Sequence, residues 1–114
     1  MTDRYDIWTT EEQLWTGGAD SFQKHMAPGC LMAFPGLGIL QGEDILVSLR
    51  EAPRWDGVSF SGEHKVESDG MIALAYTATG QRDGDSPYRA LCTSTWCLMV
   101  DGWQLVQHQQ SPAP

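Results

Sequence analysis

Apolar residues follow two different spacings along the chain, and the change comes near Trp55. Before that point, short runs with helical spacing are separated by glycine and proline. After it, apolar and polar residues alternate, as they do in strands. An order in which helices come first and antiparallel strands follow is typical of the α+β class. The sequence therefore predicts a group of helices packed on one sheet.

Three helices are expected in the first half. The first begins at Thr9 or Thr10, each of which can form a capping box with the residue three positions later, and it ends at the glycine pair 17–18. The second is capped by Asp20 and stops at the Pro-Gly pair 28–29. The third covers Glu43–Glu51. A short apolar strand is expected at residues 30–34, between the second and third helices.

Four longer strands are expected in the second half, at residues 58–67, Met71–Gln81, 88–100 and 103–110. The strand at 88–100 is apolar on both faces, with Cys92 and Trp96 on one side and Leu91 and Met99 on the other. A strand with one face in water should be apolar on the other face only. We therefore expect a second copy of the chain to cover the outer face, giving a homodimer.

Charge and composition narrow the choice of partners. The chain has 114 residues, which fits one domain over residues 1–114, and a formal net charge of -8. That charge repels phosphate backbones and anionic lipid, so neither a nucleic acid nor a membrane is an expected partner. The N-terminus lacks the features of a secretory signal, and three cysteines cannot all pair within the chain. We expect a reduced, cytoplasmic protein.

Several stretches carry a resemblance to a known superfamily. They are Glu11-Glu12-Gln13-Leu14-Trp15, Ala75-Tyr76, Ser94-Thr95-Trp96 and the ending at residues 101–112. The chain resembles, over essentially its whole length, the nuclear-transport-factor-2-like superfamily, also called ketosteroid-isomerase-like or SnoaL-like. The resemblance implies three N-terminal helices on the concave face of a strongly curved mixed sheet, forming a cone with a pocket inside. The ending looks most like an uncharacterised branch.

The last strand turns from apolar to polar and uncharged in the run QHQQ. By alternation, Gln107 and Gln109 continue the face of Leu105, and His108 continues the face of Val106. In a cone these inward positions would meet a ligand, and neutral amides orient a polar ligand without the cost of burying a charge. The alternative is that they hydrogen-bond to each other or at the rim of a dimer.

Glu11 is the sharpest candidate for chemistry. If the first helix reaches back to Ile7, Glu11 lies in an apolar stripe with Leu14, and burial would raise its pKa. It would then serve as a general base or a polar ligand contact. If the helix begins at Thr9 or Thr10, Glu11 lies in the first turn and only complements the helix dipole.

The expected site is an apolar, aromatic pocket for a small hydrophobic or aromatic ligand, closed by neutral polar groups. Its aromatic side chains could also be ordinary core. An isomerase, dehydratase or hydrolase using Glu11 or His64 for proton transfer is the alternative function, and no catalytic residue is assigned. The proposed ligand-binding residues are Glu11, Trp15, His64, Tyr76, Trp96, Gln107 and Gln109.

No cofactor or metal is expected. Cys92 and Cys97 are five positions apart and face opposite sides of a regular strand, so they cannot share one metal. The carboxylates of ketosteroid isomerase are also missing, since Phe34 stands roughly where its base would be. The isomerase mechanism is therefore not carried over.

Overall fold

Helices and strands follow one another in the order that the sequence predicts, with one strand added. The helices are α1 (Ile7–Thr16), α2 (Gly18–His25) and α3 (Glu43–Glu51). The strands are β1 (Met26–Phe34), β2 (Gly38–Gln41), β3 (Gly57–Ser68), β4 (Met71–Gln81), β5 (Tyr88–Met99) and β6 (Gly102–Pro112). The sequence did not predict β2, whose four residues are too few to show an alternating pattern.

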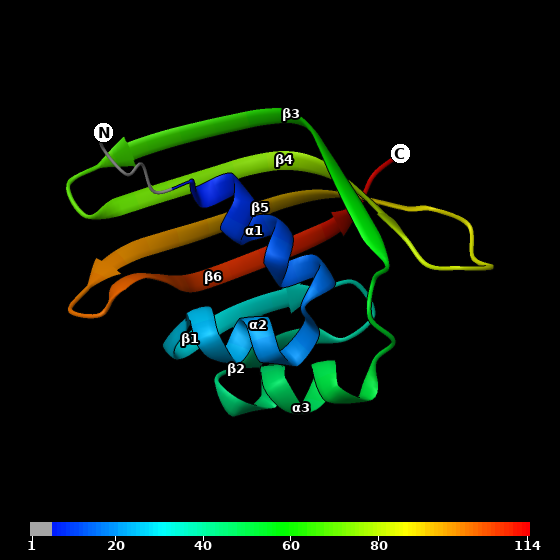
Figure 1. Ribbon diagram of the computed structural model, residues 1–114, viewed down its shortest axis with the longest axis horizontal. Helices are drawn as coiled ribbons and strands as arrows, with labels where there is room; N and C mark the ends of the chain where they lie inside the picture. The colour runs from blue at the N-terminus through cyan, green and yellow to red at the C-terminus, as the bar shows by residue number, and fades with distance from the viewer. Residues whose placement is uncertain (1–5) are drawn as a thin grey trace.

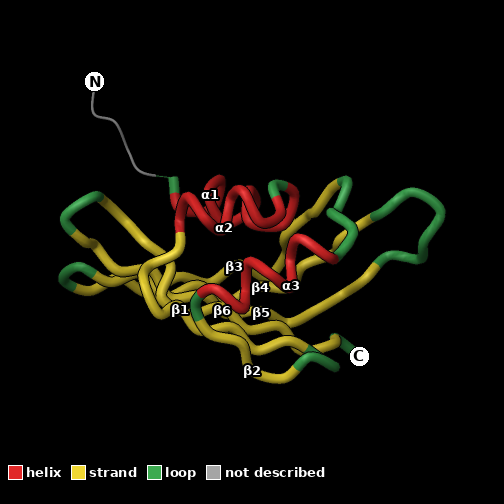
Figure 2. Tube along the Cα trace, turned by 90° about the horizontal axis from the view of Figure 1, so that it is seen from below, coloured by secondary structure: helices red, strands yellow, loops and turns green. Residues whose placement is uncertain are grey.

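The strands form one mixed sheet in the order β2-β1-β6-β5-β4-β3, and the helices lie on its concave face (Figures 1 and 2). The structure is a computed structural model and describes residues 6–114. Strands β1 and β6 are parallel, and the other neighbours are antiparallel. The predicted α+β cone is confirmed.

Helix α1 begins earlier than the capping boxes suggest. Asp6 is the N-cap, and its carboxylate accepts hydrogen bonds from the backbone N–H of Trp8 at 3.1 Å and from the hydroxyl of Thr9 at 2.6 Å. Thr9, one of the two expected start positions, lies within the first turn, so the expected start is wrong. The earlier start places Glu11 on the same buried face as Ile7 and Leu14.

The Pro-Gly pair at 28–29 lies within a strand and does not end α2. Helix α2 ends at His25, and β1 begins at Met26. Proline has no N–H to give to a sheet. The pairing of β1 with β6 accordingly shifts register between Met26 and Leu31, and Gly29 takes a positive φ of 75°. Helix α2 also begins at Gly18, so Asp20 lies in its first turn and is not its cap.

The two faces of the sheet have different surroundings. The concave face packs against the helices, and Met32, Ile45, Trp96 and Leu105 are almost completely buried there. On the convex face, Leu31, Leu91 and Met99 remain between two-fifths and half exposed. Among residues 6–114, no helix is long and apolar enough to cross a membrane. The expectation about a secretory signal depends partly on residues 1–5, which lie outside the described residues.

Candidate functional site

Glu11 is completely buried at the centre of the fold. Helix α1 crosses the concave face of the sheet (Figure 1), and the side chain of Glu11 has an exposed fraction of 0%. Its neighbours one turn away on the helix, Ile7 and Leu14, are also buried. An isolated carboxylate in such a place would be strongly unfavourable, so its hydrogen-bond partners decide whether the fold is stable.

Strands β4 and β5 supply hydrogen bonds to the Glu11 carboxylate, and β6 places a histidine beside it. The hydroxyl of Tyr76 on β4 donates to Oε2 at 2.5 Å, and Nε1 of Trp96 on β5 donates to Oε1 at 2.9 Å. The hydroxyl of Ser94 on β5 also donates to Oε2. Nδ1 of His108 on β6 lies 3.4 Å from Oε2. All the buried side-chain polar atoms among the described residues have a hydrogen-bond partner.

The surroundings of Glu11 lower its pKa. Burial on its own would raise the pKa of this carboxyl, but the contact with His108 and the hydroxyls of Ser94 and Tyr76 outweigh it. The sequence-based expectation of a raised pKa is therefore corrected. The pKa of Tyr76 is raised by burial and by the negative charge of Glu11, so Tyr76 stays protonated and keeps donating.

A series of hydrogen bonds leads from Glu11 through Ser94 and His108 to Gln110. A carboxylate can only accept hydrogen bonds, so the Ser94 hydroxyl donates one to Glu11. The same hydroxyl oxygen accepts a hydrogen bond from Nδ1–H of His108 at 2.7 Å. Nε2 of His108 then carries a lone pair, which accepts from the Gln110 amide at 3.0 Å. The hydroxyl of Tyr88 donates to Oε1 of Gln110 at 3.1 Å. The contacts fit a neutral His108 with its proton on Nδ1.

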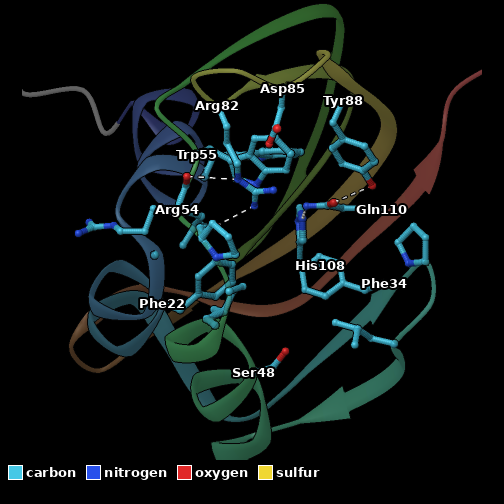
Figure 3. Close-up of a pocket in the computed structure, with 18 of the residues that line it drawn as sticks. Phe22, Phe34, Ser48, Arg54, Trp55, Arg82, Asp85, Tyr88, His108 and Gln110 are labelled. Atoms are coloured by element: carbon cyan, nitrogen blue, oxygen red, sulfur yellow. Dashed lines mark hydrogen bonds between the residues drawn. The ribbon is translucent and has the colours of Figure 1, made fainter.

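A cavity of about 620 Å³ lies on the outer side of this hydrogen-bond network (Figure 3). It opens between α1, α2, α3 and the ends of β5 and β6 that carry Tyr88 and Gln110. Its volume is that of a typical small-molecule site. The aromatic residues that line it are Trp15, Phe22, Phe34, Trp55 and Tyr88, and the polar ones are Ser48, Arg54, Arg82, Asp85, Ser86, His108 and Gln110.

The mouth of the cavity contains an ordered stack. The guanidinium carbon of Arg82 lies 3.6 Å from the centre of the Trp55 ring, and Trp55 in turn stacks on Tyr88 with the rings 5.4 Å apart and 13° from parallel. A β-carbon at Gly80 would approach the Trp55 ring to 2.9 Å, so the glycine leaves room for that ring. Both arginines that line the cavity bind backbone carbonyl oxygens.

The structure brings only part of the expected site together. Trp15 lines the cavity. Glu11, Tyr76 and Trp96 converge on one another but do not line the cavity. Trp15 connects the two groups, because its Nε1 donates a hydrogen bond to the Tyr76 hydroxyl at 3.2 Å. Contact of Glu11, Tyr76 or Trp96 with a ligand remains a prediction that no observation tests.

Gln107, Gln109 and His64 lie on the convex face instead. Gln107 donates to the Thr95 hydroxyl at 3.0 Å, and Gln109 accepts from the Thr93 hydroxyl at 3.3 Å. Exposed His64 contacts the carbonyl oxygen of Gly62 through Nδ1 at 2.8 Å. The expected inward direction of these three side chains is therefore corrected, because none of them reaches the cavity.

Two irregular pairings explain these corrections. Strands β5 and β6 pair Thr95 with Gln107 but Trp96 with Leu105, so Val106 is an extra residue on β6. Alternation restarts one position later, which buries His108 in place of Gln107. A similar shift on β3, between Ser61 and His64 where Gly62 has a φ of 58°, turns His64 outward.

Sequence reasoning missed His108, Gln110 and Arg82 as lining residues. The QHQQ run did indicate the right segment, but the residues expected to point inward were the wrong two of the four. Arg82 follows the end of β4 in a polar turn, and nothing in the sequence indicates that it would lie over Trp55. Within residues 6–114, no group of three His, Cys, Asp or Glu side chains is placed to hold a metal ion.

Solved structures share this fold over nearly its whole length. A protein from Parabacteroides distasonis, provisionally described as a ketosteroid isomerase, is 17% identical, covers 94% of this chain and 85% of its own, and has a TM-score of 0.82. An NTF2-like protein of unknown function from Prochlorococcus marinus is 14% identical over 100% of this chain and 95% of its own, with a TM-score of 0.78.

A third similar structure is the CaMKII hub of S. rosetta, at 14% identity, 99% and 100% coverage and a TM-score of 0.79. Identities this low show the fold alone. The chain has the NTF2-like, cystatin-like fold, as the resemblance in its sequence predicts. No model of a known protein family matches the chain, and no curated protein is significantly similar to it in sequence.

Replacing Glu11 with Gln should destabilise the protein. The amide N–H groups face hydroxyl donors and leave at least one donor without an acceptor, which lowers the free energy of unfolding by about 1–3 kcal/mol. Urea denaturation measures the change. Glu12→Gln is the control, because Glu12 lies next to Glu11 on α1 but is exposed; its effect should stay within about 0.5 kcal/mol.

The difference between the wild type and E11Q should also depend on pH. Because the folded-state pKa of Glu11 is lowered, the unfolded chain takes up the proton first as the pH falls below the ordinary value of 4.5. The wild type then loses stability that E11Q never had, and the gap narrows. A gap that stays constant from neutral pH down to about pH 3 would contradict the lowered pKa.

Proposed function

We propose that this chain is a homodimeric small-molecule-binding domain whose ligand is hydrophobic or aromatic. The observation that carries the proposal is the cavity of about 620 Å³ with five aromatic side chains in its wall and His108 and Gln110 on its inner side. Few, fixed polar groups in an apolar wall are typical of ligand sites. The buried network supports the proposal, because it holds His108 and Gln110 in one orientation without a ligand.

Filling the cavity should abolish ligand binding. Ser48 lines it from α3 (Figure 3), so Ser48→Trp places an indole inside the cavity. We expect the fluorescent probe N-phenyl-1-naphthylamine to bind S48W at least about tenfold more weakly than the wild type. Val47→Trp is the matched control, because Val47 precedes Ser48 on α3 and is exposed. If folded S48W and the wild type bind equally well, the cavity is not the site.

The convex face supports the homodimer part of the proposal. Leu31, Leu91 and Met99 are exposed there, and β4 carries the small side chains Ala73 and Ala75 beside a shallow depression on the same face. Several large apolar side chains exposed on one face are typical of an interaction surface. Covering it with a second copy would bury the exposed leucines. The shared fold of a CaMKII hub is further support for self-association.

Replacing Leu91 with Asp should therefore give a monomer. The new carboxylates would have to be desolvated in the proposed interface, which opposes association. Light scattering at micromolar concentration should show a dimer for the wild type and a monomer for L91D. Val47→Asp puts the same charge on exposed α3 and should leave the dimer intact. A monomeric wild type under these conditions would rule out the dimer.

Proton transfer is the second candidate function, and His108 supports it better than Glu11 or His64. Glu11 lies behind the wall, and His64 lies on the convex face. His108 lines the cavity, is 2% exposed, and has its Nδ1 proton held by Ser94 and Glu11. A ligand that displaces the Gln110 amide would meet the Nε2 lone pair. We therefore assign the base of the proposed isomerase, dehydratase or hydrolase type to His108.

The opening of 5-nitrobenzisoxazole tests this base. His108 Nε2 would take the proton from C3, the N–O bond would break, and the negative charge would move to the phenolate oxygen. We expect His108→Gln to lower the rate at least about tenfold, since general bases contribute at least that much. His64→Gln should leave the rate unchanged. Equal rates for the wild type and H108Q would exclude His108 as a base in the cavity.

A further inference from the structure

We propose that the cavity selects an amphiphilic anion: a small molecule with an aromatic body and a carboxylate that binds Arg82. The inference rests on the proposed small-molecule site and specifies the class of its ligand. The observation that carries it is the position of one guanidinium group, which lies in the cavity and has no carboxylate partner among residues 6–114. Its geometry, its free donors and the charges around it point to the same ligand.

Arg82 is held in place before any ligand binds. Its Nη2 donates to the Pro53 carbonyl at 2.7 Å, and its Nε donates to the Arg54 carbonyl at 3.3 Å. Its planar group also lies 3.6 Å from the centre of the Trp55 ring. Figure 3 shows the side chain reaching past Trp55 into the cavity. A group fixed in this way loses little further freedom when it binds an anion.

The remaining donors of Arg82 match a carboxylate. A guanidinium has five N–H groups, and the two carbonyls occupy the edge formed by Nε and Nη2. The adjoining edge, formed by one N–H of Nη1 and the second N–H of Nη2, is left. It presents two parallel N–H groups, which is the geometry that binds both oxygens of a carboxylate. A lysine at this position would offer the charge without that fork.

The charges around the cavity leave Arg82 unneutralised. Among the described residues, basic side chains contact acidic ones at Lys65 with Glu67 and at His108 with Glu11, and neither contact includes Arg82. Arg54 also lines the cavity, but its guanidinium points away and donates to the Gly17 carbonyl at 2.7 Å (Figure 3). Asp85 is the carboxylate in the lining, and it forms no ion pair with Arg82.

The aromatic wall beside Arg82 determines the rest of the ligand. Trp55 stacks with Tyr88, and Trp15 lies 5.9 Å from Trp55, so a flat ring has aromatic surfaces next to the guanidinium. An apolar wall also lowers the local dielectric constant, which strengthens the attraction between Arg82 and an anion. A ligand with the carboxylate at Arg82 would extend its body toward Phe22, Phe34 and His108.

A pair of nearly isosteric probes tests the charge without altering the protein. Naphthalene-2-carboxylate and naphthalene-2-carboxamide share the aromatic body and differ in charge. We expect calorimetry on the full chain to show at least about tenfold tighter binding of the carboxylate, as a charge-assisted bidentate contact should give. Raising the salt concentration should weaken the binding of the carboxylate and leave the carboxamide unchanged.

Two variants test the assignment to Arg82. Arg82→Gln should remove the preference for the carboxylate and leave the affinity for the carboxamide within about twofold. Asp85→Asn should leave the carboxylate affinity unchanged or increase it, because it removes the one acidic side chain from the lining. If R82Q does not fold, the wild-type probe pair and its salt dependence still decide the question.

The possible failures are distinguishable. Equal binding of both probes to the wild type, or a preference that survives in folded R82Q, overturns the anion proposal and leaves the small-molecule site in place. If neither probe binds, and N-phenyl-1-naphthylamine does not bind either, both proposals are wrong. Binding of the carboxylate that S48W does not weaken would place the anion outside the cavity and overturn the inference.

Discussion

A single carboxylate joins one helix to three strands of this protein. Glu11 receives hydrogen bonds from Tyr76 on β4 and from Ser94 and Trp96 on β5, and it lies beside His108 on β6. A completely buried charge is tolerated only when donors surround it. Turning α1 by one residue, about 100°, would remove the carboxylate from these donors. The network therefore fixes how α1 lies on the sheet, and with it the inner wall of the cavity.

The same network determines which polar groups lie at the inner end of the cavity, in its middle and at its mouth. At the back, the charge of Glu11 is fully satisfied by buried donors. In the middle, His108 and Gln110 present neutral groups whose directions follow from the proton held between His108 and Ser94. At the mouth, Arg82 carries a positive charge next to Trp55. The fold thus separates a structural carboxylate from the groups that a ligand could touch.

The periodicity of the sequence was enough for the α+β cone but not for the direction of every side chain. Spacing alone gave α3 and β4 with their observed bounds, and it offered the apolar stripe as one of two positions for Glu11. It could not give the lowered pKa of Glu11, because the donors come from positions more than sixty residues away. Nor could it place Arg82, whose contacts with Pro53, Arg54 and Trp55 are made by loops distant in sequence.

Alternation failed at Gln107, Gln109 and His64 because it assumes an unbroken strand. The extra residue Val106 on β6 has a consequence for how such a cavity could diversify during evolution. Losing one codon there would restore regular pairing, with Gln107 still opposite Thr95 and His108 still opposite Ser94. The deletion would straighten β6 without changing which side chains face the cavity. The polar side of the cavity is therefore insulated from the loss of this residue, and only a slip of the strand pairing beyond it would bring Gln107 and Gln109 inward.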